Sequence, residues 1–139
     1  MSKEPEETLQ TEDALQTEDA LQTERYPYYM DLGVDKYITA GCERKLSKEL
    51  VNALFLLAYA HASDLDEKGL SADYLLVFNI ESNDKHVKVK LSQEVPEYSR
   101  QYEFMVERTE GKEFTGKVYM IEDVGEDIHH ITLLLPEEY

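Results

Sequence analysis

The sequence predicts an α+β fold in which an antiparallel sheet of five to six strands carries one main helix packed on one face, behind a flexible N-terminal tail. Apolar residues recur at helical spacing over residues 47–66. The segments after this helix alternate between apolar and polar residues, as strands with one buried face do. We therefore expect a largely disordered tail and linker over residues 1–33 and a single folded domain over residues 34–139.

The tail contains a short repeat. The hexamer Thr-Glu-Asp-Ala-Leu-Gln occurs at residues 11–16 and again at residues 17–22. In a helix this repeat would put Leu9, Leu15 and Leu21 on three different sides, because six residues rotate the chain by about 240°. No apolar face would form, which favours disorder over a stable helix.

An aromatic linker follows over residues 25–32, which Pro27 keeps extended. Two interpretations remain open for it. In the first, Tyr28 and Met30 pack onto the edge of the domain. In the second, the tyrosines anchor a partner, because a tyrosine buries a large area at low entropic cost. The candidate anchors are Tyr26, Tyr28 and Tyr29.

The first expected strand covers residues 34–40 and is ended by Gly41. Ser47 is a good N-cap for the main helix, and Gly69 is a stop signal behind it. The apolar face of this helix is expected to contain Leu50, Ala53, Leu54, Leu56, Leu57, Ala58 and Ala60.

Strands account for the remainder of the domain. Residues 74–80 are largely apolar on both faces, which is typical of a central strand. Residues 87–91 alternate and form a hairpin with them across the turn residues 82–84. Three more alternating strands are expected at residues 102–106, 118–121 and 131–135.

Charge limits the classes of partner. The chain has a net charge of −16, and residues 25–139 keep −9 of it. Such a surface repels phosphate, so direct binding to nucleic acid or to an anionic membrane is not expected, whereas a protein with a basic surface is. With no long apolar run and no secretory signal, the expected location is cytoplasmic.

Two segments contain residue types that bind metals. Asp64 and Asp66 begin like a calcium loop, but Lys68 occupies a position that needs an oxygen ligand. Farther on, two histidines follow a run of acids. On a strand, neighbouring histidines point to opposite faces, so they cannot share a metal. We expect no metal site, and a solvated acidic loop formed by Glu122, Asp123, Glu126 and Asp127 ahead of His129 and His130.

Three further features have competing interpretations. Cys42 is the lone cysteine and is expected to be a packing residue. The loop over residues 92–98 is either a tight structural loop or a binding loop through Glu94, Glu97 and Tyr98. A basic stripe either pairs with neighbouring acids or binds a small anion or an acidic partner. This stripe contains His86, Lys88 and Lys90, extended by Lys85 and Arg100.

Four segments resemble an uncharacterised family, the domain of unknown function 960. They read KYITAG from Lys36, DYLLVF from Asp73, SQEVPEY from Ser92 and LLLPEEY from Leu133, and the resemblance covers about residues 35–139. It implies a protein of low-GC Gram-positive bacteria, their phages or their plasmids. The family has no established activity, so it supplies no catalytic, cofactor-binding or metal-binding residue.

The expected function is that of a non-enzymatic accessory module that binds another protein through an acidic surface. A mobile-element origin suggests a narrower alternative, a nucleic-acid mimic that inhibits a host defence or DNA-binding protein, as anti-CRISPR proteins do. A second alternative is an enzyme of unrecognised class. The candidate partner-binding residues are Tyr26, Tyr28, Tyr29, Glu94, Glu97, Tyr98, Glu122, Asp123, Glu126 and Asp127.

Overall fold

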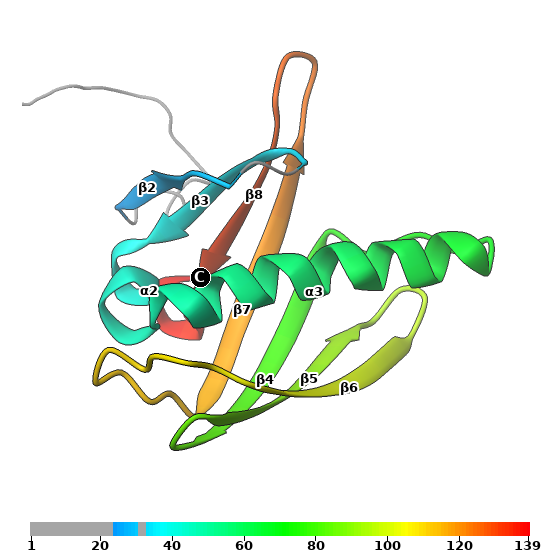
Figure 1. Cartoon of the computed structure of the whole chain (residues 1–139). Helices are drawn as coiled ribbons and strands as arrows, with labels where there is room; N and C mark the ends of the chain where they lie inside the picture. The colour runs from blue at the N-terminus through cyan, green and yellow to red at the C-terminus, as the bar shows by residue number, and fades with distance from the viewer. Residues whose placement is uncertain (1–23, 31–32) are drawn as a thin grey trace, which may run out of the picture.

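The computed structural model describes residues 24–30 and 33–139 of the chain. In this part a seven-stranded sheet lies against one long helix, α3 (Figure 1). The strands are β2 (Arg25–Tyr28), β3 (Asp35–Thr39), β4 (Leu75–Asn83), β5 (His86–Gln93), β6 (Tyr98–Met105), β7 (Gly116–Val124) and β8 (His129–Leu134). The helices are α2 (Ala40–Lys45), α3 (Lys48–Glu67) and a 3-10 turn, η1 (Pro136–Glu138).

The sheet is mostly antiparallel, with the strand order β2-β3-β8-β7-β4-β5-β6. Strands β3 and β8 are parallel neighbours, so the expectation of an entirely antiparallel sheet is wrong at this pair. Strand β8 takes its direction from the hairpin that it forms with β7. That direction coincides with the direction of β3, beside which β8 is inserted.

Helix α3 confirms the main helix that the sequence predicts. The Ser47 hydroxyl accepts a hydrogen bond from the Leu50 backbone N–H at 3.1 Å, as an N-cap should. Past the other end of the helix, Gly69 adopts a left-handed φ of 73°. The predicted apolar face is wrong for Leu56, which is 50% exposed, and for Ala60, which is exposed as well. Leu56 lies six residues after the buried Leu50, about 240° around the helix.

The core lies between α3 and one face of the sheet. Strand β4 has β5 and β7 as neighbours, which confirms the predicted central strand and the predicted β4–β5 hairpin. Alternate residues of these strands are buried toward the helix. They include Leu76, Phe78, Ile80, Val87, Val89, Leu91, Val118 and Met120.

Strand β2 is the reason that the strand count exceeds the prediction. The sequence predicts a linker over residues 25–32, but Arg25–Tyr28 pairs with β3 at the edge of the sheet. The proline in this segment argues against a strand only for central positions, because an edge strand tolerates a missing N–H donor. The hexamer repeat predicted to be disordered, residues 11–22, lies outside the described residues.

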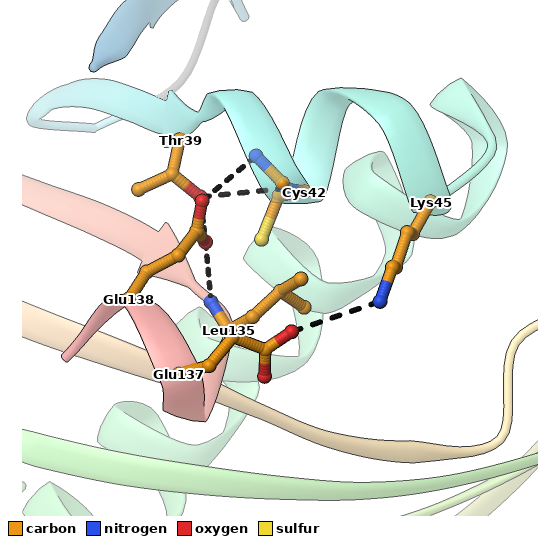
Figure 2. A network of polar contacts seen from close by, with 7 residues as sticks. Thr39, Cys42, Lys45, Leu135, Glu137 and Glu138 are labelled. Carbon is orange, nitrogen blue, oxygen red and sulfur yellow. Dashed lines mark hydrogen bonds and ion pairs between the residues drawn. The ribbon is translucent and has the colours of Figure 1, made fainter. Parts of the chain in front are cut away.

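A short helix replaces the strand end predicted at Gly41. Helix α2 begins at Ala40, and the Thr39 hydroxyl accepts a hydrogen bond from the Cys42 N–H at 3.4 Å. A second N–H group of this turn, that of Gly41, donates to the Glu138 carboxylate at 2.8 Å. Figure 2 shows Glu138 beside Thr39 at the start of α2. A Cβ atom at Gly41 would lie 2.5 Å from this carboxylate, so the glycine serves close packing here and not the end of a strand.

The segment after β6 is fastened to the first turn of α3. The Glu49 carboxylate accepts hydrogen bonds from the backbone N–H groups of Glu107 at 2.8 Å and Arg108 at 3.0 Å. A few residues later, the Lys112 ammonium donates to the Glu43 carbonyl of α2 at 3.1 Å. Glu49 therefore holds the chain between β6 and β7 against the helical layer.

The two hydrogen bonds to the Glu49 carboxylate predict an acid-sensitive contribution to stability. The two backbone donors hold the pKa of Glu49 below its ordinary value of 4.5. The contribution is therefore fully present above that value and is lost as the pH falls through the lower folded-state pKa. We expect Glu49→Gln to lower the urea midpoint at pH 7, and the gap to wild type to close as the pH falls from 4.5 through the lowered pKa of Glu49. Glu113→Gln should show neither effect, and a constant gap for Glu49→Gln would contradict the prediction.

Candidate partner-binding surface

Two of the three predicted groups of binding residues contain exposed acids. Glu126 and Asp127 lie in the exposed turn between β7 and β8. The expectation of a solvated loop is wrong for Glu122 and Asp123, which pair with β8 near the end of β7 and are half-buried. We call these four residues the acidic hairpin, which projects from one end of the sheet (Figure 1). Glu94 and Glu97 are exposed in the turn between β5 and β6.

A small pocket lies between the acidic hairpin and the second half of α3. It has a volume of about 160 Å³. We call it the α3 pocket. Most of its lining residues are apolar, and the acidic residues Asp73 and Glu122 are among them. The residues that line it are Val34, Ala58, Tyr59, Ala62, Ala72, Asp73, Tyr74, Leu76, Met120, Glu122, His129 and Ile131.

The two histidines of the hairpin have different surroundings. His129 lines the α3 pocket, and its Nε2 lies 2.6 Å from a Glu122 carboxylate oxygen. His130 lies opposite Asp123 and packs edge-on against the Tyr37 ring, with 5.1 Å between centroids. Burial is the main cause that lowers the pKa of His130. The predicted opposite orientation is thus confirmed, and the described residues contain no cluster of three or more metal-ligating side chains.

Side-chain hydrogen bonds from Gln93 and Asp73 hold the turn that carries Glu94 and Glu97. The Gln93 amide nitrogen donates to the Pro96 carbonyl at 2.8 Å, and its oxygen lies 2.8 Å from Nε2 of the buried His61. The Asp73 carboxylate accepts a bond from the Val95 N–H at 3.1 Å. The two exposed acids therefore sit on a turn that is fixed to α3 and to the start of β4.

Tyr98, the predicted aromatic contact of this loop, packs inward. Its ring lies 5.7 Å from the His61 ring, and the Lys68 ammonium lies 5.9 Å above it. Next to it, Arg100 forms an ion pair with Asp64 of α3. The residues that begin like a calcium loop thus belong to the last turns of α3 and bind β6.

The predicted tyrosine anchors lie elsewhere, beside the first half of α3 (Figure 1). The Tyr28 hydroxyl donates to the Asn52 side chain, and its ring packs 5.5 Å from the Phe55 ring. This geometry favours the first interpretation, packing onto the domain edge. Tyr26 is 40% exposed and Tyr29 is 90% exposed.

A second pocket, with a volume of about 560 Å³, is larger than the α3 pocket and is lined by Tyr26 and Tyr28. Its floor is apolar, with Ile38, Leu46 and Val51, and its charged side chains have both signs. These are Glu43, Lys48, Glu110 and Lys112. The structure therefore does not bring the tyrosines together with the acidic hairpin. Among the described residues, the lining of the α3 pocket includes Asp73, Glu122 and His129 and neither a lysine nor an arginine.

Sequence reasoning missed Gln93, His61 and Asp73. Position 93 continues the buried alternation of Val87, Val89 and Leu91. A polar residue at a core-facing position must find hydrogen-bond partners inside the protein, and this signal would have identified Gln93. His61 carries the same signal on the buried face of α3.

The described residues support neither a reactive cysteine nor a membrane-spanning helix. Cys42 is fully buried, and burial raises the pKa of its thiol to about 12, which leaves no reactive thiolate. Within residues 24–30 and 33–139, no helix combines the length and apolar character that crossing a bilayer requires.

The fold and surface define a small α+β protein, a mostly antiparallel sheet with one long helix on a face and an acid-bordered pocket beside that helix. The chain belongs to the family described as staphylococcal protein of unknown function (DUF960), whose model matches residues 35–138. This confirms the resemblance that four short segments indicate.

One solved structure gives a further comparison. It is a protein of unknown function from Enterococcus faecalis, with 25% sequence identity and a TM-score of 0.51. The alignment covers 75% of this chain and 89% of that chain. No curated protein matches the chain. These comparisons support the family and the fold and supply no activity.

Proposed function

We propose that this protein is a protein-binding module that holds a basic segment of a partner against the acidic hairpin, with one apolar side chain of that segment inserted in the α3 pocket. The observation that carries the proposal is the composition of this pocket, apolar walls with Glu122 and Asp73 among them. A cavity of about 150 Å³ takes a benzene ring, so 160 Å³ suits one branched or aromatic side chain.

Charge favours a basic partner at this place. Glu126 and Asp127 are exposed beyond the pocket, and the described residues offer neither of them an ion pair within 4.0 Å. A lysine or arginine of a partner would meet carboxylates that need not be released from another contact first. Such charges mainly raise the association rate and select the partner, while the apolar anchor supplies affinity.

Nucleic-acid mimicry is a narrower form of the same proposal. In that form the partner segment lines a groove that otherwise binds DNA or RNA, and the acids of the hairpin take the place of phosphates. Enzymatic chemistry is less well supported. The Glu122–His129 pair could exchange a proton, but no third described residue is seen to orient it toward a nucleophile.

The apolar anchor can be tested with a lysine-rich peptide that carries one central leucine, compared with the same peptide carrying glycine instead. Binding is measured by fluorescence anisotropy on the full chain. We expect the leucine peptide to bind about tenfold or more tightly, because burying one such side chain is worth about 1.5–3 kcal/mol. Ala62→Leu fills the pocket and should abolish this difference. Ser63→Leu, on the neighbouring exposed position, should preserve it.

The acidic hairpin is tested with the same leucine peptide. The double variant Glu126→Gln, Asp127→Asn should weaken binding and flatten its dependence on salt concentration. Glu113→Gln with Glu137→Gln removes the same charge elsewhere and should change little. Equal binding of both peptides, or equal effects of the two double variants, would refute the proposal. Mimicry is tested by replacing the leucine peptide with a segment of a DNA- or RNA-binding protein. Displacement of that segment by its own nucleic acid would support mimicry.

A further inference from the structure

The face of the sheet turned away from α3 combines apolar residues with lysines. Leu75 and Val77 of β4 lie beside Ile121 and Tyr119 of β7, and all four are half-buried without a helix over them (Figure 1). The 3-10 turn borders this area, with the Tyr139 ring 5.6 Å from the Tyr119 ring. In the described part of the chain, an apolar area therefore remains open to contact.

A cationic row crosses the same face directly beside this apolar area. Asn79 of β4 is paired in register with Lys90 of β5 on one side and with Lys117 of β7 on the other. The next residue along the row is Gln101 of β6, so no acid interrupts it. Both lysines are exposed, and the described residues give neither of them an ion pair within 4.0 Å.

Acids lie beside three other residues of the predicted basic stripe, His86, Lys88 and Arg100. Lys88 is paired in register with Glu81 on β4 and Glu103 on β6. His86 lies 3.6 Å from the Glu103 carboxylate. Cross-strand proximity to acids, the first interpretation of the stripe, thus fits Lys88 and His86, whereas Lys90 fits the second, an acidic ligand. Lys117, which the predicted stripe did not include, extends the cationic row on β7.

The chain itself contains a segment with the complementary chemistry. Its hexamer repeat places an acid two residues before a leucine twice, in Asp13–Leu15 and in Asp19–Leu21. In an extended chain, residues two apart point to the same side, about 6.8 Å apart. Lys117 and Tyr119 have the same spacing on β7, so a carboxylate can meet the lysine while the leucine meets the apolar area.

The repeat also starts close enough to reach this face. The Glu24 carbonyl accepts a hydrogen bond from the Ala40 N–H at 2.9 Å, which fixes the end of the repeat at the edge of the sheet. Arg25 donates to the Thr132 hydroxyl, on the face away from α3. From β2 to β7 there are three strand spacings, about 14 Å. Asp13 precedes Glu24 by eleven residues, and a random-coil linker of that length would span about 18 Å.

We propose that the uncovered face of the sheet binds the chain's own N-terminal repeat, residues 9–22, with Lys90 and Lys117 contacting its carboxylates and the apolar area of β4 and β7 contacting its leucines. This surface lies on the other side of the sheet from α3 and its pocket, so the proposal stands independently of the partner-binding function. Tethering keeps the repeat at a high effective concentration, so two lysines and an apolar area suffice for occupancy.

The contact can be measured in the full chain by paramagnetic relaxation. Thr17→Cys introduces a site for a nitroxide, since Cys42 is fully buried. We expect the label to broaden the amide signals of Asn79, Lys90 and Lys117 and to spare Ser63 on α3. Added salt should reduce the broadening.

Two variants and one mixture decide the outcome. Lys90→Gln with Lys117→Gln should remove the broadening, while Lys68→Gln with Lys85→Gln, which removes the same charge elsewhere, should preserve it. Absent or uniform broadening, or broadening that survives the first pair, overturns the proposal. A mixture of isotope-labelled chain and separate spin-labelled chain should show no broadening at equal concentration. Broadening there would assign the face to the repeat of a second copy and overturn the contact within one chain.

Discussion

Replacing Gln93 by alanine is expected to lower the free energy of unfolding by about 3 kcal/mol. Gln93 is 5% exposed and satisfies four groups with one amide. Its oxygen accepts from the Asp73 N–H at 2.9 Å and lies 2.8 Å from Nε2 of His61. Its nitrogen donates to the carbonyls of Ser71 at 3.2 Å and Pro96 at 2.8 Å.

The expected loss is large because these partners have no ready substitute. His61 is fully buried, and its Nδ1 already lacks a hydrogen-bond partner among the described residues. Without Gln93 both ring nitrogens would be buried without partners, and an unsatisfied buried polar group costs about 1–3 kcal/mol. Because the amide nitrogen donates to two carbonyls, its oxygen must face His61, so His61 carries its proton on Nε2.

The measurement is urea unfolding followed by circular dichroism, with Gln101→Ala as the matched control. Gln101 is exposed on the neighbouring strand β6, and its truncation should stay within about 0.5 kcal/mol of wild type. Hydrogen exchange should also rise over residues 71–73 and 94–97 in the Gln93 variant, because both segments lose their shared anchor. Equal destabilisation by the two substitutions would show that Gln93 has no special structural role.

Periodicity predicted the elements that bury an apolar face. The sequence marks helix α3 by the N-cap Ser47 and by Gly69 after its end. Strand β5 alternates between apolar and polar residues, and β4 has the apolar residues on both faces that a central strand needs. These signals depend on residues close together in the chain, so they can be recognised without knowledge of the fold. The boundaries of α3 differ from the prediction by one residue at each end.

Elements that depend on distant partners escaped prediction. Strand β2 is four residues long with a proline inside it, and only its pairing with β3 makes it a strand. Helix α2 has six residues and depends on a carboxylate almost a hundred residues later. Likewise, the α3 pocket joins Ala62 to Glu122, a juxtaposition that no local pattern encodes. Only the acidic residues of the hairpin could be selected in advance, by their charge.

The second large effect is expected at Glu138, whose replacement by alanine should lower the free energy of unfolding by about 2 kcal/mol. Its carboxylate accepts from the Thr39 hydroxyl at 2.5 Å, from the Gly41 N–H at 2.8 Å and from the Leu135 N–H at 2.9 Å. These bonds join η1 to the start of α2 (Figure 2). Without the carboxylate, half-buried donors at the N-terminus of α2 would lose their partner.

Glu137→Ala is the matched control, because Glu137 lies one residue away and contacts only the Lys45 ammonium among the described residues, at 3.6 Å. Both of these side chains are more than half exposed, so the pair should contribute less than about 0.5 kcal/mol. Gly41→Ala tests the same clamp from the other side. The new Cβ would lie 2.5 Å from a Glu138 carboxylate oxygen and 2.8 Å from a Leu135 methyl carbon, so one of them must move.

If the carboxylate is the group displaced, Gly41→Ala and Glu138→Ala remove the same hydrogen bonds, and the double variant should be little less stable than either single variant. Additive losses in chemical unfolding would show instead that the alanine strains the packing of Leu135 and leaves the clamp intact. Equal stability of the Glu138 and Glu137 variants would contradict the clamp altogether. In either single variant, hydrogen exchange should rise first in α2, since its N–H groups lose the acceptor that the far end of the chain supplies.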